Sequence, residues 1–215
     1  MKVGILGSGD VGRALGAKFA ALGHEVKIGT RDVKKKEVAD WLKGTKGKVS
    51  AGSFSEAAAH GEIVVLCTNG AGAENAVELA GEKNLGAKVL IDVTNPLDFS
   101  KGMPPGLFVG TSESLAERIQ AKLPKAKVVK AFNIVGNAQM VNPKMKDGTP
   151  TMIVAGNDAG AKEKVSSVLK EFGWDDVVDA GDLAGARWLE AWVPLWVRVC
   201  EATGSWNVAI RILRK

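Results

Sequence analysis

The sequence predicts an α/β fold, in which a doubly wound, mostly parallel sheet is followed by a small C-terminal α+β lobe. Short apolar runs alternate with amphipathic segments as far as Phe132, which is typical of β–α units around a parallel sheet. Two of these runs, "IVVLC" and "VLIDV", are continuously apolar, as expected for strands buried on both faces. After Phe132 the pattern changes to a loop rich in Gly, Pro and Asn, followed by further strands and helices.

The first part of the chain is expected to alternate between strands and helices. The strands coincide with the short apolar runs and cover residues 2–6, 25–29, 48–50, 63–68, 88–93 and 127–132. The helices fill the intervals and cover residues 11–22, 33–43, 55–60, 73–80 and 112–123. Because crossovers between parallel strands are right-handed, these units wind around a single sheet.

The C-terminal part is expected to add a strand at 151–156, a helix at 161–172, a short strand at 176–181 and a long helix at 184–202. We therefore expect two domains. Residues 1–126 form the sheet domain, and residues 127–215 form a smaller lobe that packs against it.

The composition is that of an ordinary globular chain of 215 residues, with 46% hydrophobic and 25% charged residues. The net charge of +5 favours anionic partners, but the basic residues are spread along the chain and form no nucleic-acid-binding motif. Cys67 and Cys200 have no metal-site spacing and indicate buried thiols in a reducing compartment. The chain shows neither a signal peptide nor a membrane span, so we expect a cytoplasmic protein with no membrane, nucleic-acid or metal partner.

A glycine motif, "GSGDVG", lies between the first strand and the first helix. Gly7 permits a tight turn, Gly9 lets a ligand approach the backbone, and Gly12 allows close packing of helix on strand. The following helix N-terminus attracts phosphate groups. With the strand, the helix and the next strand in register, the motif predicts a Rossmann-type dinucleotide site at residues Gly7, Ser8, Gly9, Asp10, Val11 and Gly12.

The end of the second strand distinguishes between two dinucleotides. An acid normally stands there to bind the ribose 2′-hydroxyl, but this chain has Thr30 and Arg31, with Lys35 in the next turn. A hydroxyl and a guanidinium bind a 2′-phosphate, which an acid would repel. Asp32 is interpreted as the N-cap of the following helix rather than as a displaced ribose acid. The sequence therefore predicts NADP(H) as cofactor.

Small polar residues follow the later strands, at the carboxyl edge where ligands of open α/β sheets bind. The cofactor candidates among them are Cys67, Thr68, Asn69, Thr94, Asn95 and Pro96, and the candidates for positioning a substrate are Asn95, Asn133 and Asn137. Each of these residue types is also a common turn former.

Proton donors are scarce among the predicted site residues. The chain has no tyrosine, and both His24 and His60 precede strands, on the edge away from the ligand. Lys130 is the one cation on the strand at 127–132 that could serve instead, and it can equally point into solvent. Reduction of an alcohol, hydroxy acid or imine normally needs a positioned proton donor, whereas hydride transfer between two flat carriers needs mainly alignment. This favours a redox carrier as the second substrate.

The last helix carries Trp188, Trp192 and Trp196 at a spacing of four residues, which places them on one side of the helix. Such a stripe is more often core or subunit interface than a cofactor platform. We expect it to contribute to a homodimer contact.

Five stretches, "GSGDVG", "GHEVKIGTRD", "VLIDVTNPL", "VVKAFN" and "DAGDLAGARWLE", resemble the NADP-dependent, coenzyme F420-linked oxidoreductases over nearly the whole length of the chain. The reductase domain of six-transmembrane ferric reductases is a relative of that family. The resemblance implies NADP binding by residues 1–126, a second-substrate site and dimer contact in residues 127–215, and F420 or a flavin (FMN or FAD) as redox carrier. Archaeal members carry His and Pro where this chain has Asn133 and Gly136.

Two other functions are compatible with the sequence. One is an NADPH-dependent reductase of a small carbonyl or imine substrate, although the C-terminal part contains strands rather than the long all-helical lobe usual in such enzymes. The other is an NADP-sensing protein that binds without turnover.

Overall fold

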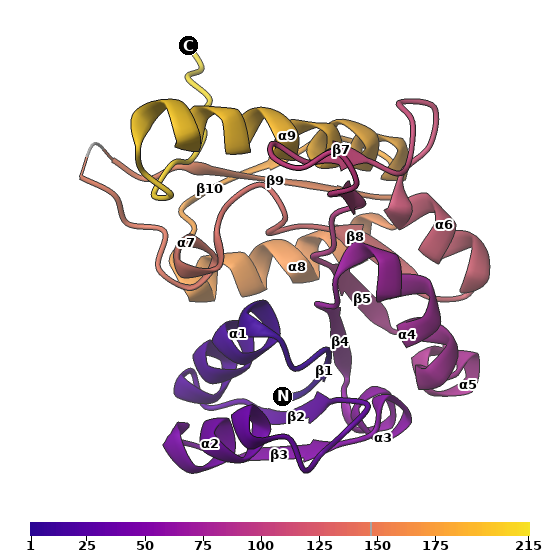
Figure 1. Cartoon of the computed structure of the whole chain (residues 1–215). Helices are drawn as coiled ribbons and strands as arrows, with labels where there is room; N and C mark the ends of the chain where they lie inside the picture. The colour runs from indigo at the N-terminus through magenta and orange to yellow at the C-terminus, as the bar shows by residue number, and fades with distance from the viewer. Residues whose placement is uncertain (147) are drawn as a thin grey trace.

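The computed structural model describes residues 1–146 and 148–215 and contains one eight-stranded sheet with helices on both faces (Figure 1). The strand order is β10-β9-β8-β5-β4-β1-β2-β3. The strands are β1 (Lys2–Leu6), β2 (Glu25–Gly29), β3 (Val49–Gly52), β4 (Ile63–Leu66), β5 (Val89–Asp92), β8 (Lys127–Lys130), β9 (Thr151–Gly156) and β10 (Asp176–Asp179). A separate antiparallel pair is formed by β6 (Leu97–Asp98) and β7 (Gly106–Leu107).

The helices alternate with the strands along the chain. They are α1 (Asp10–Ala21), α2 (Lys36–Gly44), α3 (Phe54–His60), α4 (Ala73–Ala80), α5 (Glu82–Leu85), α6 (Leu115–Lys122), α7 (Asn137–Val141), α8 (Ala159–Phe172) and α9 (Ala186–Thr203), with short 3₁₀ turns η1 (Gly70–Gly72) and η2 (Leu183–Gly185). The mostly parallel sheet and the flanking helices confirm the predicted Rossmann-type α/β class. The predictions did not include α5, α7 or the β6–β7 pair.

Both faces of the sheet are buried, as the continuous apolar runs predicted. On one face Ile5, Val65 and Ile91 share a core with residues of α1, α2 and α8. On the other face Leu66 and Leu90 share a second core with residues of α3, α4 and α6. β1 lies between β2 and β4, and the winding changes direction between β1 and β4. A doubly wound sheet binds its ligand at this switch point.

The sheet continues without a break into the C-terminal part of the chain. β8 pairs in parallel with β5, β9 joins β8 in antiparallel orientation, and β10 extends β9 in parallel. Figure 1 shows α8 and α9 on opposite sides of β9 and β10. The division into two domains at residue 126 stays a prediction, since the strand that would open the second lobe belongs to the common sheet.

Helix α2 begins later than predicted, and the expected role of Asp32 as its N-cap is wrong. The helix starts at Lys36 with Lys35 as its N-cap residue. The Asp32 carboxylate instead accepts the Lys34 backbone N–H at 2.9 Å. This side-chain bond closes a local turn, which competes with helix formation over residues 33–35.

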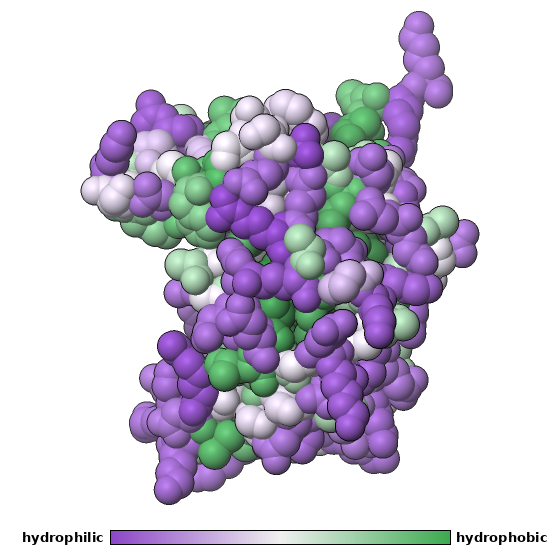
Figure 2. Space-filling model, turned by 90° about the vertical axis from the view of Figure 1, so that its right-hand side faces the viewer, coloured by the Kyte–Doolittle hydropathy of each residue, from purple (hydrophilic) through white to green (hydrophobic). Residues whose placement is uncertain are grey.

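Helix α9 is amphipathic. Its buried side consists mainly of apolar residues, whereas the exposed fraction is 65% for Trp188 and 54% for Leu195. Figure 2 shows another face of the molecule, largely hydrophilic with small separate apolar areas. No helix among residues 1–146 and 148–215 is both long and apolar enough to span a bilayer.

Candidate dinucleotide and hydride-transfer site

The three motif glycines occupy positions that exclude a side chain or leave space for a ligand. Gly7 has a φ of +124°, and a Cβ there would lie 2.9 Å from the Cys67 carbonyl. A Cβ on Gly12 would lie 2.0 Å from the Gly7 oxygen, so α1 can approach β1 only without one. A Cβ on Gly9 would meet nothing within 4 Å. Gly7 and Gly12 therefore shape the turn, whereas Gly9 faces open space.

Helix α1 begins immediately after this turn with no side-chain cap on Gly9. Its free N–H groups and positive dipole end therefore remain available to an anion. Arg13 adds a cation that the sequence reasoning missed. Its guanidinium donates to the Ser8 carbonyl at 2.8 Å and pairs with Asp10 at 2.5 Å, and it lines the adjoining cavity. The only signal for it was its position in the first turn of the helix.

A cavity of about 880 Å³ opens at the carboxyl ends of β1, β2 and β4. Of the predicted cofactor residues, it is lined by Gly7, Ser8, Gly9, Thr30, Arg31, Lys35, Cys67, Thr68 and Asn69. The predictions omitted other lining residues, namely Arg13, Lys36, Glu37, Val38, Phe54, Ala71, Gly72, Asn75 and Ala76. Most of these lie on α2, η1 and α4, whose approach to the glycine turn depends on the tertiary fold.

The remaining predicted cofactor residues are not in the lining of this cavity. Asp10, Val11 and Gly12 form the first turn of α1, directly after Gly9. Thr94, Asn95 and Pro96 follow β5, the next strand along the sheet after β4. They belong to a second group of polar residues beyond the cavity.

Thr30 and Arg31 differ in how far their side chains are engaged. The buried Thr30 hydroxyl accepts a hydrogen bond from Ser8 Oγ at 3.0 Å, which ties the end of β2 to the glycine turn. Arg31 is exposed and makes no hydrogen bond or ion pair with any of the described residues. A ligand phosphate at this end of the cavity would therefore meet an uncompensated guanidinium. Asp32 is not in the cavity lining.

Asn95 and Asn133 form a reciprocal amide pair across the ends of β5 and β8. Asn95 Nδ2 donates to the Asn133 carbonyl at 3.0 Å, and Asn133 Nδ2 donates to Asn95 Oδ1 at 2.9 Å. Asn137 is exposed at the start of α7 and its side chain does not join this pair within the described part of the chain. The structure thus brings two of the three predicted positioning residues together.

Two buried side-chain oxygens near this edge have no partner among the described residues, Thr68 Oγ1 and Asn133 Oδ1. A buried polar atom without a hydrogen bond is unfavourable, and native structures contain few of them. Such atoms at the predicted ligand edge fit a dinucleotide that brings its own donors and acceptors. The open glycine turn and the unpaired Arg31 fit its phosphates.

Directly beneath the amide pair lies a group of buried charges that the sequence did not predict. Lys130 is fully buried, so the expectation that it can point into solvent is wrong. Its ammonium pairs with Asp92 at 2.9 Å and with Glu190 at 2.7 Å, and it donates to the Thr94 carbonyl at 2.5 Å. Burial raises the pKa of Glu190, while the neighbouring carboxylates keep the pKa of Lys130 above its usual value despite burial. All three ammonium protons are engaged.

Other titratable groups are poorly placed for proton transfer at this edge. His24 contacts Glu171 at 2.9 Å, and His60 contacts the Glu25 carbonyl at 3.2 Å, so both lie near the amino end of β2. Burial strongly raises the pKa of the Cys67 thiol, which keeps it protonated and a weak nucleophile.

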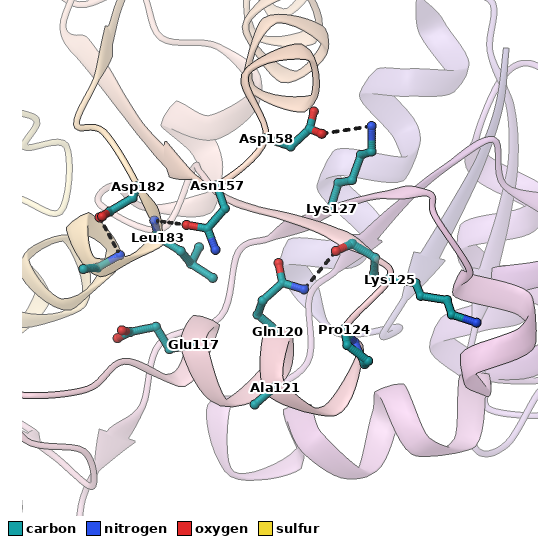
Figure 3. A pocket seen from close by; sticks show the side chains of 12 residues that line it. Glu117, Gln120, Ala121, Pro124, Lys125, Lys127, Asn157, Asp158, Asp182 and Leu183 are labelled. Carbon is teal, nitrogen blue, oxygen red and sulfur yellow. Dashed lines mark hydrogen bonds and ion pairs between the residues drawn. The ribbon is translucent and has the colours of Figure 1, made fainter.

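A second cavity, of about 770 Å³, lies where the amino end of β8 meets the carboxyl end of β9 (Figure 3). Its polar side chains largely bind one another or the backbone. Asp158 pairs with Lys127 at 3.0 Å, and Asn157 accepts the Leu183 N–H at 2.9 Å. The first cavity, with its glycine turn and unpaired guanidinium, is the better candidate for a functional site.

The glycine turn, the uncapped helix and a cavity at the switch point place the protein in the class of Rossmann-fold dinucleotide-binding proteins. Residues 2–96 match the family described as NADP oxidoreductase coenzyme F420-dependent. The chain is 30% identical over 224 residues to the F420-dependent NADP reductase of Methanocaldococcus jannaschii, covering 99% of this chain and 98% of that protein. It therefore belongs to this family of NADP-dependent oxidoreductases.

Two further comparisons agree with this assignment. A crystal structure from Arthrobacter sp. FB24, described as a candidate F420-dependent NADP-reductase, superposes with a TM-score of 0.95 at 42% identity and full coverage of both chains. The metalloreductase STEAP3 of Rattus norvegicus is 30% identical over 208 residues. The chain spans 38% of the length of that metalloreductase.

Proposed function

We propose that this protein transfers a hydride between NADP(H) and coenzyme F420 or a flavin. The observation that carries the proposal is the neutral character of the carboxyl edge beyond the cavity. Asn95 and Asn133 are amides, and the one cation beneath them, Lys130, has its three protons bound to Asp92, Thr94 and Glu190. Such an edge can align two flat rings but offers no ready proton for an alkoxide.

The phosphate part of NADP(H) is assigned to the cavity. The turn at Gly7–Gly9 and the N-terminus of α1 would hold the pyrophosphate, and Arg31 with Lys35 would bind the 2′-phosphate. The residues after β4 and β5 would hold the nicotinamide end, where Thr68 Oγ1 and Asn133 Oδ1 lack partners. When bound, NADPH supplies a hydride from its nicotinamide ring.

F420 is the first choice for the second substrate. The relatives from Methanocaldococcus jannaschii and Arthrobacter sp. FB24 support it by their description as F420-dependent reductases. FMN and FAD are the alternatives, because Asn133 and Gly136 stand where the archaeal proteins were expected to carry His and Pro. A flavin and a deazaflavin present similar flat rings, so the carrier panel must contain both.

We further propose that the protein acts as a homodimer through the outer side of α9 and the segment after it. Trp188 and Leu195 on α9 and Trp206 in the segment after it are 65%, 54% and 54% exposed, and exposed apolar patches often mark protein–protein contacts. A closed dimer is the commonest arrangement that covers such a surface. A cytoplasmic location stays a prediction from the sequence.

The direct test is steady-state kinetics with NADPH against F420, FMN and FAD, beside a keto acid and a cyclic imine. Turnover of at least one carrier, with little activity on the carbonyl and imine compounds, supports the proposal. Reduction of a keto acid or imine without carrier turnover would establish the alternative reductase. Tight NADPH binding without turnover of any compound would establish the sensor.

A further inference from the structure

The buried charge cluster formed by Asp92, Lys130 and Glu190 joins elements that are far apart in the sequence. Asp92 ends β5, Lys130 ends β8 beside it in register, and Glu190 lies on α9. All three residues are fully buried. Glu190 also accepts the backbone N–H groups of Leu115 and Ala116 at 2.8 and 3.2 Å, so it holds the start of α6 as well.

The cluster fixes Thr94 through all of its hydrogen-bonding groups. Asp92 Oδ1 accepts the Thr94 backbone N–H at 2.9 Å and the Thr94 hydroxyl at 2.7 Å, and Lys130 binds the Thr94 carbonyl at 2.5 Å. The next residue is Asn95, whose side chain forms the pair with Asn133. The backbone from which Asn95 projects therefore has little freedom while Lys130 keeps its bonds.

The same helix that supplies Glu190 also holds Asn133. Asn133 Nδ2 donates to the carbonyl of Leu189, the residue before Glu190, at 3.0 Å. Phe132, the residue before Asn133, has a φ of +66°, which a bulky side chain rarely adopts. Strain of this kind persists only where the surroundings enforce it, and it gathers at functional sites.

These contacts leave Asn133 with a fixed acceptor. Both Nδ2 protons go to carbonyl oxygens, of Asn95 and Leu189, so the amide cannot be turned around. Its Oδ1 is buried and has no donor among the described residues. The amide pair thus leaves one oriented acceptor oxygen without a donor. An amide-type N–H would satisfy it, and both a nicotinamide carboxamide and a deazaflavin or flavin ring possess one.

We propose that Lys130 is a positioning residue for hydride transfer: through Asp92, Thr94 and Glu190 it holds the Asn95–Asn133 pair so that Asn133 Oδ1 receives an N–H of the nicotinamide or of the carrier ring. The inference rests on the proposed function. Stability alone is a weak reason for such a cluster, because well-packed apolar residues often replace buried ion pairs without loss. Apolar replacements would, however, release Thr94.

The test compares a charge-balanced double variant, Asp92→Asn with Lys130→Met, with the wild type and a matched control. The control is Lys127→Met, the same substitution on the same strand, where the lysine is 42% exposed and pairs with Asp158. Calorimetry gives the Kd for NADPH and for 2′-phospho-ADP-ribose, which lacks the nicotinamide. Stopped-flow absorbance gives the hydride-transfer rate and the half-saturating carrier concentration.

We expect the double variant to slow hydride transfer about 100-fold, the size of effect that a displacement of about 1 Å produces. Its Kd for 2′-phospho-ADP-ribose should stay within about twofold of the wild type, as should all values for Lys127→Met. A raised Kd for NADPH identifies the nicotinamide as the partner of Asn133, and a raised half-saturating carrier concentration identifies the carrier ring. Introducing the double variant into Asn95→Ala should add little further loss, because both act through one amide pair.

Equal loss of affinity for NADPH and for 2′-phospho-ADP-ribose would overturn the inference, since it would show general damage to the cofactor site. So would unchanged binding of NADPH and carrier with an unchanged rate, or additive losses with Asn95→Ala. If wild-type protein turns over no carrier, the proposed function fails, but the two Kd values still decide the role of Lys130 toward the nicotinamide. Should the double variant not fold, Glu190→Gln must show the same selective pattern, and its absence there contradicts the role.

Discussion

Arg31→Ala tests the choice of NADP(H) over NAD(H). Arg31 lies at the cavity and binds none of the described residues, so a 2′-phosphate gains its guanidinium without breaking an internal bond. A charge-assisted hydrogen bond contributes about 1.5–3 kcal/mol. At about 1.4 kcal/mol for each factor of ten, the variant should bind NADPH about 10- to 150-fold more weakly. NADH lacks the phosphate, so its affinity should hardly change.

Calorimetry with NADPH and NADH measures both affinities on the same preparations. Lys34→Ala is the matched control. Lys34 is an exposed cation in the same turn, but it does not line the cavity. It should weaken NADPH binding only slightly, by the general loss of positive potential. Lys35 and Lys36 remain at the cavity, which limits the loss in Arg31→Ala. An equal loss of NADPH and NADH affinity would refute the 2′-phosphate role of Arg31.

Three further predictions concern the glycine turn, the acid side of the stability profile and the assembly. Gly9→Ala should keep the wild-type melting temperature and bind NADPH more weakly. Gly12→Ala should lose at least about 1–3 kcal/mol of stability, because its Cβ would meet the Gly7 carbonyl. A stable Gly12→Ala beside a destabilised Gly9→Ala would contradict the roles assigned to the two glycines. The hydrogen bond from Arg187 lowers the pKa of Glu117 below its ordinary value of 4.5 in the folded protein. The pair therefore stabilises the fold above about pH 4.5, and this stabilisation is lost as the pH falls through the lowered pKa. Glu117→Gln should flatten the decline in melting temperature below about pH 4.5, and an unchanged decline counts against the pairing. Trp188→Asp should convert a dimer to a monomer in light scattering, and a monomeric wild type at micromolar concentration removes the dimer proposal.

The parts of the fold that depend on local pattern could be predicted from the sequence. The central strands and the glycine turn follow from apolar runs and from three glycines at fixed spacing, and the structure shows why two of those glycines cannot carry a Cβ. The start of α2 could not be predicted in the same way. The Asp32 side chain binds a backbone N–H two residues on, and the sequence alone does not show whether an Asp caps a helix or closes such a local turn.

The buried charge cluster was beyond sequence reasoning for a different reason. Lys130 stands among apolar residues on a strand with no polar–apolar alternation, so pattern alone allows it to point either way. Its burial depends on two partners that are distant in sequence, Asp92 in register on the neighbouring strand and Glu190 on a helix 60 residues later. Arg13 was missed because its position in the first turn of a helix is common for surface arginines, and its contacts to Ser8 and Asp10 become visible only in the structure.

Transfer of deuterium from NADPH to F420 tests the central claim most directly. NADPH that carries deuterium at both C4 positions of the nicotinamide is mixed with protein and oxidised F420, and the product is examined by mass spectrometry. A reduced deazaflavin keeps a transferred deuteride on carbon, whereas a reduced flavin nitrogen exchanges it with water. The account predicts one deuterium in the reduced F420 and a primary isotope effect on the single-turnover rate where chemistry limits it. Reduced F420 without deuterium, or no reduction of F420 or a flavin beside ready reduction of a keto acid or imine, would contradict it.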